Sequence, residues 1–174
     1  MLTQLPASLD PYRAAAADKH FSGRISAGGF TRLASSVLAI AEEGVELDLS
    51  FGSRQDVRAS LTGTVQVEVE MECQRCLGPM WVPVTGQFKL AFVRFPSEVD
   101  EVPDDLEAIQ LDKPEIDLRA LIEDELILAL PLVPMHQESC QAWQDDEAAT
   151  DDTQAGAEPK DNPFAVLAKL KQDS

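Results

Sequence analysis

The sequence is poor in several features, and each shortage limits what this protein can be. Its 174 residues include only three cysteines, two histidines and one tyrosine, and no apolar run approaches the roughly 20 residues needed to cross a bilayer. An odd number of cysteines argues against a disulfide framework. The N-terminus, MLTQLPASLDPYR, lacks the basic stretch and apolar run of a signal peptide. We therefore expect a cytoplasmic protein with reduced thiols and no membrane association.

Basic residues are also scarce, and the acidic surplus is confined to one part of the chain. The formal net charge is −17. Residues 1–96 hold 10 acidic and 9 basic residues, whereas residues 97–161 hold 20 acidic and 3 basic residues. Seven of the nine bases in the first part are arginines, which suit bidentate phosphate contacts. No cluster is dense enough to indicate a nucleic-acid patch, so scattered surface arginines are the ordinary interpretation.

Catalytic signatures are missing as well. The sequence has no glycine-rich phosphate loop and no G-x-S-x-G motif. The run Glu123-Asp124-Glu125 suggests the carboxylate cluster of a two-metal nuclease. Three consecutive helix residues point in different directions, however, so we expect a solvated helix face there. We therefore expect a protein that is not an enzyme.

What is present is a strong periodic pattern, which predicts an α+β fold. Apolar residues recur at every second position in runs such as VELDLSF and VQVEVEMEC, as expected for half-buried antiparallel strands with one wet face. We predict a mainly antiparallel sheet or partly open barrel from residues 21–95. Pro83 suggests that its last strand begins at a sheet edge. Helical spacing predicts flanking helices over residues 30–41 and 117–130, and residues 96–114 are expected to be irregular.

The ends of the chain divide it into three predicted parts. Asp10 and Pro11 suit an N-cap and first helical position, so a short helix should open a single α+β domain spanning residues 1–143. Residues 144–161 have almost nothing to bury and are expected to be a disordered acidic linker. Residues 162–174 hold a short amphipathic stretch that cannot stay helical alone in water, and we expect it to dock on its own domain or on a partner.

The cysteines form the most informative pattern. Cys73 and Cys76 are spaced C-x-x-C where a strand runs into a turn, which is typical of a zinc knuckle. A redox C-x-x-C instead favours a helix N-terminus, and the flanking strands argue against that use. His136 and Cys140 supply two further ligands, and four sulfur and nitrogen ligands fit a closed structural zinc site. The ordinary alternative is that no metal is bound. Cys73 is then a small core residue, Cys76 and Cys140 are free thiols, and His136 is a surface imidazole.

Arg75 is our candidate for RNA contact. It lies between Cys73 and Cys76, in the part of the turn that we expect to be exposed, and an arginine there could reach a phosphate. Its ordinary interpretation is a solvent-facing turn residue.

Several motifs together resemble the YceD family of bacterial large ribosomal RNA subunit accumulation proteins. They are LDPYR near the start, ECQRCLGP, IDLRALIEDELILALPLVPMH and the closing NPFAVLAKLK, and they occur in this order over nearly the whole chain. The resemblance implies a role in synthesis, processing or stability of the large-subunit (23S) rRNA, without an established catalytic activity. Some relatives carry further cysteines after the Leu-Pro element, where this chain has His136 and Cys140, so the resemblance leaves metal binding open.

Two functions therefore remain from the sequence. The first is a non-enzymatic ribosome-biogenesis factor that acts on the large-subunit rRNA precursor. The second is an acidic adaptor or chaperone for a basic ribosomal protein, without direct RNA contact, in which the acidic block would attract the basic partner. No small-molecule substrate is expected, and one structural zinc ion is the only cofactor that the residues suggest.

Overall fold

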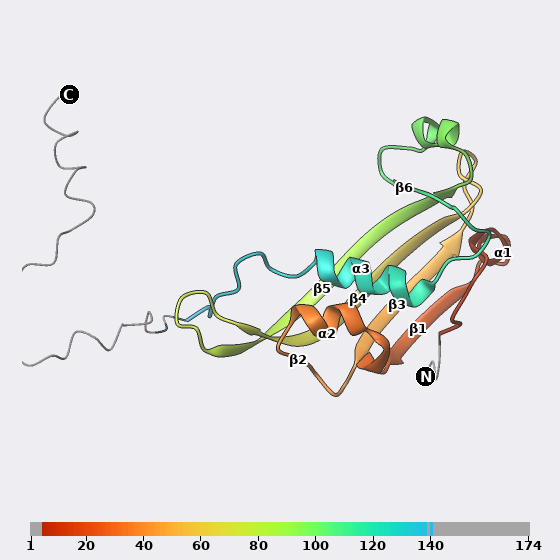
Figure 1. Cartoon of the computed structure of the whole chain (residues 1–174). Coiled ribbons are helices and arrows are strands. Elements are labelled where there is room, and N and C mark those ends of the chain that lie inside the picture. Colours follow the sequence, from red (N-terminus) through yellow and green to blue (C-terminus); the bar gives the residue numbers. More distant parts are fainter. Residues whose placement is uncertain (1–4, 139, 141–174) are drawn as a thin grey trace, which may run out of the picture. The chain divides into compact units, whose positions relative to one another are not determined.

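The computed structural model describes residues 5–138 and residue 140. These residues form the α+β fold predicted from the sequence, with one open, mostly antiparallel sheet and few helices (Figure 1). In chain order the elements, with η for a 3₁₀-helix, are α1 (Pro11–Ala16), β1 (His20–Ile25), η1 (Ala27–Gly29), α2 (Thr31–Ser36), β2 (Ala39–Ile40), β3 (Val45–Gly52), β4 (Ser60–Glu72), β5 (Pro79–Val93), η2 (Pro96–Glu101), β6 (Glu107–Gln110) and α3 (Leu118–Leu128). No helix in the described part of the chain is long and apolar enough to cross a membrane.

The sheet is built around one long hairpin. Its strand order is β1-β3-β4-β5-β6, and the short β2 also pairs with β4. Strands β4 and β5 pair from Ser60 opposite Ala91 to Glu72 opposite Pro79, so their turn projects beyond the other strands. β1 and β6 form opposite edges, which leaves the sheet open rather than closed into a barrel.

One face of the sheet forms the core and the other is wet. In β3, for example, Val45, Leu47 and Leu49 are buried, whereas Glu46 and Asp48 between them are exposed. This alternation follows from the two-residue period of a strand. The pattern predicted from the sequence is therefore confirmed along this strand.

Helix α3 covers the inner face of the sheet (Figure 1). Leu118, Ile122 and Leu126 form its fully buried stripe. Gly86 of β5 allows the close approach, because a Cβ atom there would lie 3.2 Å from the backbone oxygen of Glu125. The helix begins as predicted at Asp117, whose carboxylate accepts a hydrogen bond from the Ala120 N–H at 3.0 Å.

The helix predicted over residues 30–41 is too long. α2 ends at Ser36, and Val37 is already extended, with φ −133° and ψ 166°. Ala39 and Ile40 form β2 and pair with Glu70 and Val69 of β4. Apolar residues at helical spacing continue through this stretch, but pairing with a distant strand overrides the local pattern.

The prediction that residues 96–114 are irregular is also wrong in part. They contain η2 and the edge strand β6, which pairs with residues 90–93 of β5 in parallel. The proposed linker at 144–161 and docking segment at 162–174 lie outside the described residues, so these two parts and their boundaries remain proposals.

Candidate metal centre

The turn between β4 and β5 brings the first two cysteines together. The Cys73 N–H donates to the Gly78 carbonyl at 2.9 Å, and the Leu77 N–H donates to the Cys73 carbonyl at 2.9 Å. Leu77 adopts a positive φ of 58°, which lets the chain reverse within the C-x-x-C turn. The hairpin end that was predicted from the strand pattern is therefore confirmed as the frame for Cys73 and Cys76.

The other two residues arrive on the segment that follows α3. This segment runs from the end of the helix to the tip of the β4–β5 hairpin (Figure 1). The Gln74 N–H donates to the Pro134 carbonyl at 2.8 Å, and this bond fixes the segment against the turn. The chain thereby places His136 and Cys140 beside the C-x-x-C pair.

All four residues lie close together, as the sequence predicted. One ligand atom from each of Cys73, Cys76, His136 and Cys140 lies within 4.8 Å of the others. The Sγ atoms of Cys73 and Cys140 are 3.8 Å apart, and the Cys76 Sγ is 3.5 Å from the His136 Nδ1. Cys73 is buried and the other three are half-buried. Within the described part of the chain, this is the one group of three or more His, Cys, Asp or Glu residues that could hold a metal ion.

The chemistry of this donor set fits zinc. Three thiols and one imidazole are soft or borderline ligands, which zinc prefers over the oxygen ligands that calcium and magnesium require. A set of four protein ligands also leaves no open position, as in structural rather than catalytic sites. The residues could therefore hold one zinc ion that ties the hairpin to the segment after α3.

Neighbouring groups favour the charged thiolate at two of the three cysteines. Burial raises the pKa of the Cys73 thiol, but the N–H groups of Cys76 and Arg75 and contacts with His136 outweigh it and lower the pKa to about 5. Burial likewise opposes ionisation of Cys140, whose pKa is nevertheless lowered, chiefly by Arg75. At Cys76 the Gly78 N–H lowers the pKa, but burial and the two other thiols outweigh it and raise the pKa. A cation at the centre would remove this conflict between neighbouring negative charges.

Arg75 faces this cluster. Its Nε donates to the Cys140 Sγ at 2.9 Å, and its Nη2 donates to the carbonyl oxygens of His136 at 3.2 Å and Glu138 at 2.6 Å. The side chain is half-buried rather than exposed as expected. The sequence placed Arg75 between the two cysteines but contained no signal that its guanidinium would contact the segment 60 or more residues away.

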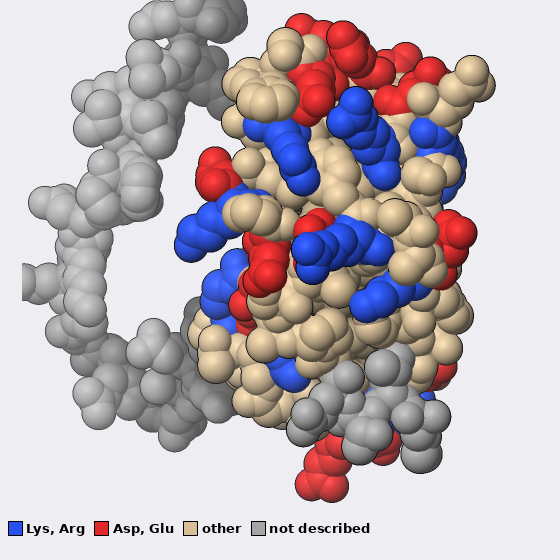
Figure 2. Space-filling model, turned by 90° about the vertical axis from the view of Figure 1, so that its right-hand side faces the viewer, with Lys and Arg blue, Asp and Glu red and all other residues tan. Residues whose placement is uncertain are grey.

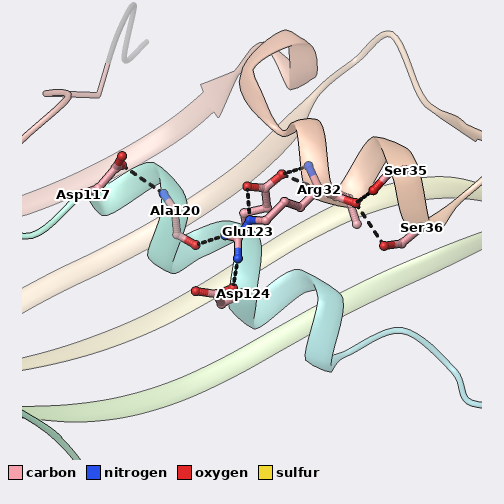
Figure 3. A network of polar contacts seen from close by, with 8 residues as sticks. Arg32, Ser35, Ser36, Asp117, Ala120, Glu123 and Asp124 are labelled. Carbon is pink, nitrogen blue, oxygen red and sulfur yellow. Dashed lines mark hydrogen bonds and ion pairs between the residues drawn. The ribbon is translucent and has the colours of Figure 1, made fainter.

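The three consecutive carboxylates of α3 do not converge on one point. Glu123 is only 5% exposed, and its Oε1 accepts hydrogen bonds from the N–H groups of Arg32 and Leu33 at the start of α2 (Figure 3). Its Oε2 pairs with the Arg32 Nε at 3.0 Å, and Asp124 also pairs with Arg32. The expected solvated face is therefore wrong for Glu123, which ties α3 to α2. The reason is that Glu123 follows Ile122 at the border of the buried stripe.

The comparisons with known proteins agree with one another. A family model described as "Large ribosomal RNA subunit accumulation protein YceD" matches residues 61–171 of this chain. The chain is also 37% identical over 176 residues to a protein of Haemophilus influenzae that bears the same description, and the match covers 97% of each chain. No solved structure matches this chain.

Proposed function

Because the chain belongs to the YceD family of large ribosomal RNA subunit accumulation proteins, we propose that it is a non-enzymatic ribosome-biogenesis factor that supports the accumulation of 23S rRNA. It would act in the cytoplasm on the synthesis, processing or stability of the large-subunit rRNA precursor. One observation carries this proposal: the similarity to the Haemophilus influenzae protein extends over 97% of both chains. It therefore includes the hairpin turn, α3 and the segment that follows α3, rather than the sheet alone.

We further propose that Cys73, Cys76, His136 and Cys140 hold one structural zinc ion. The close approach of all four ligand atoms supports this assignment. When bound, the ion supplies positive charge and cross-links the turn to the segment after α3. Neighbouring groups lower the pKa of the Cys73 and Cys140 thiols, which is the direction that favours metal binding, and Arg75 orients the Cys140 sulfur.

Direct RNA contact would be made by arginines. The end of the molecule at which α1 lies carries several Lys and Arg side chains; acidic side chains gather along its top and are also scattered among and beside the basic ones (Figure 2). Arg94 stacks on the Tyr12 ring at 4.4 Å, and Arg58 is a further cation beside the same ring; both arginines are exposed. Arg75 remains our single proposed contact from the sequence, although its guanidinium is engaged beside Cys140.

The second candidate function is an acidic adaptor for a basic ribosomal protein. It is favoured by the wet face of β4, where Glu68, Glu70 and Glu72 recur at every second position. Side chains with this spacing lie in one row on the sheet face. A row of carboxylates repels phosphate and attracts cations, so this surface suits a basic protein better than RNA.

A depletion experiment tests the leading function. Cells that lack the protein should contain less 23S rRNA relative to 16S rRNA, and the wild-type chain should restore the ratio. Gel-shift measurements with precursor 23S rRNA, with and without basic ribosomal proteins, separate the two candidate functions. Binding to RNA alone supports direct contact, whereas RNA association only through an added protein supports the adaptor. An unchanged 23S content on depletion would exclude both.

A separate measurement tests the zinc site. Protein purified without chelator should contain one zinc ion per chain, and Cys140→Ser should lower that content. If protein from cells grown with excess zinc contained no zinc, the four residues would be three ordinary thiols and an imidazole.

A further inference from the structure

Large exposed apolar side chains gather where the β4–β5 hairpin meets the segment after α3. We call this region the tip surface and define it by Leu38, Leu77, Trp81, Leu132, Val133 and Met135. Leu132 is 99% exposed and Trp81 is 48% exposed, which is unusual for side chains of this size. Single exposed apolar residues are common, but a group of them indicates an interaction surface.

Two hollows border the segment that carries Leu132 and Met135. One hollow, of about 380 Å³, is lined by Leu38, Leu132 and Met71 among others. The other, of about 430 Å³, is lined by Trp81, Met135 and neighbouring residues of β5. Two such recesses can receive apolar anchors from one bound segment.

The tip surface is also held in place. The hydrogen bond from Gln74 to Pro134 and the contacts from Arg75 to residues 136–140 fix the segment to the C-x-x-C turn. Pro131 and Pro134 further restrict its backbone. A preorganised surface loses little conformational entropy on binding, which favours affinity.

The charge around the tip surface is negative. Glu70 lies opposite Trp81 in the strand pairing, and Glu72 lines the first hollow. Neither they nor Glu68 take part in an ion pair with another residue that the structure describes. Neither hollow is lined by a lysine or an arginine, and the guanidinium of Arg75 is already used. Apart from the nearby Arg75, no described lysine or arginine is available at the two hollows to neutralise a phosphate, so this surface suits a basic peptide better than an RNA base stacked on Trp81.

We propose that the tip surface binds a lysine- or arginine-rich segment of another protein that carries large apolar anchor residues. The apolar anchors enter the two hollows, and the basic side chains meet the carboxylates of β4. This proposal makes the acidic-adaptor function more specific. Its choice of partner, a basic protein of the large ribosomal subunit, rests on the proposed role in ribosome biogenesis.

The test uses the full chain and overlapping 15-residue peptides that cover the large-subunit ribosomal proteins of Haemophilus influenzae. Fluorescence anisotropy measures the affinity of each labelled peptide. The tightest peptides should be rich in lysine or arginine and contain at least one large apolar residue. The double variant Leu132→Ser/Met135→Ser should weaken their binding about tenfold or more, as expected for the loss of central anchors.

Matched variants show whether the effect is local. Phe95→Ala/Val99→Ser removes two exposed apolar side chains near η2 and should change affinity less than about twofold. Replacing Glu68, Glu70 and Glu72 by Gln should flatten the salt dependence of binding, whereas the same loss of charge at Asp100, Glu101 and Asp104 should not. Circular dichroism and zinc content establish that each variant is folded.

Several results would overturn the proposal. They are the absence of any binding peptide, peptides without positive charge, equal weakening by both apolar variants, and binding of 23S rRNA fragments that the tip variant abolishes.

Amide exchange of the free chain is a further check: protection of residues 131–135 by a second copy or by residues 141–174 would show that the surface is already covered. Measuring 23S rRNA in cells that carry Leu132→Ser/Met135→Ser separates the peptide-binding proposal from the proposed function. If this variant bound peptides with normal affinity but lowered the 23S content, the peptide-binding proposal would fail and the proposed function would stand.

Discussion

Arg75 donates a hydrogen bond from Nε to the Cys140 Sγ at 2.9 Å, although the two residues are 65 positions apart in the chain. The contact links the C-x-x-C turn to the segment after α3 without any metal. It also places a permanent positive charge beside a sulfur whose pKa is lowered. Arg75 therefore stabilises the arrangement of ligands that zinc would bind.

Replacing Arg75 by Gln should lower zinc affinity about 10- to 100-fold, the usual effect of removing a group that hydrogen-bonds a metal ligand. Arg75→Lys keeps the charge, but an ammonium group cannot reach three acceptors as the planar guanidinium does. The zinc affinity of this variant should therefore lie between those of the wild type and Arg75→Gln. Competition with a chromophoric chelator measures both. Arg24→Gln, which removes an exposed arginine paired with Glu46, is the control. Equal affinity in all three variants would remove Arg75 from the site.

Arg75→Glu should weaken binding of precursor 23S rRNA and reduce the salt slope by about one if Arg75 contacts a phosphate. Arg58→Glu, which changes an exposed arginine beside Tyr12, tests the other end of the molecule in the same way. Gel shifts at several salt concentrations give both slopes. Because Arg75 also contacts the candidate metal centre, the gel shifts use zinc in excess, so that the weaker zinc binding expected of this variant does not change its zinc content. Unchanged affinity and slope would contradict the RNA contact.

Glu123→Ala should lower the free energy of unfolding by about 3 kcal/mol, because two N–H groups of α2 and the Arg32 Nε lose a buried charged acceptor. Glu123→Gln should cost roughly half as much, since an amide oxygen can still accept from the two N–H groups. Urea denaturation measures both values. Asp124→Ala removes the neighbouring exposed carboxylate and should cost less than about 1 kcal/mol. A similar cost at both positions would show that Glu123 has no special role.

Glu125→Gln should stabilise the protein at pH 7. Burial, with Glu107 and Asp124 nearby, raises the pKa of the Glu125 carboxyl above its usual value. A raised pKa means that the folded state holds the proton more tightly, so ionisation at neutral pH opposes folding. The gain should be below about 1 kcal/mol and should disappear as the pH falls through the raised pKa to the ordinary value. Thermal melts from pH 4 to 8 check this, with the exposed Glu42→Gln as control.

Local signals predicted much of the fold. Asp10 and Asp117 cap α1 and α3 where expected, and Pro11 is the first residue of α1. These positions were predictable because capping depends on residues within one helical turn. The strands were visible because one face of the sheet is buried and the other is wet. Residues 37–40 were wrongly predicted to be helical because the chain leaves α2 after Ser36, and Ala39 and Ile40 pair with β4 about thirty positions later.

The candidate metal centre was predictable only as a set of residue types. The C-x-x-C spacing and the later His136 and Cys140 suggested the donor set, and the fold brings them together. The roles of Arg75 and Glu123 could not be predicted, because each side chain acts on an element far away in the sequence. Their partners are set by packing rather than by spacing.

The separation of 60 positions from Cys76 to His136 also has a consequence for timing. A ribosome that adds about 5–20 residues per second needs roughly 3–12 s to synthesise this interval. During that period a nascent chain presents two thiols without the residues that complete their surroundings. The four-residue set can form only after the sheet and α3 have been made. A metal ion would then be bound by all four ligands only after the whole domain has been synthesised. A chain truncated after α3 would keep Cys73 and Cys76 without the other two ligands.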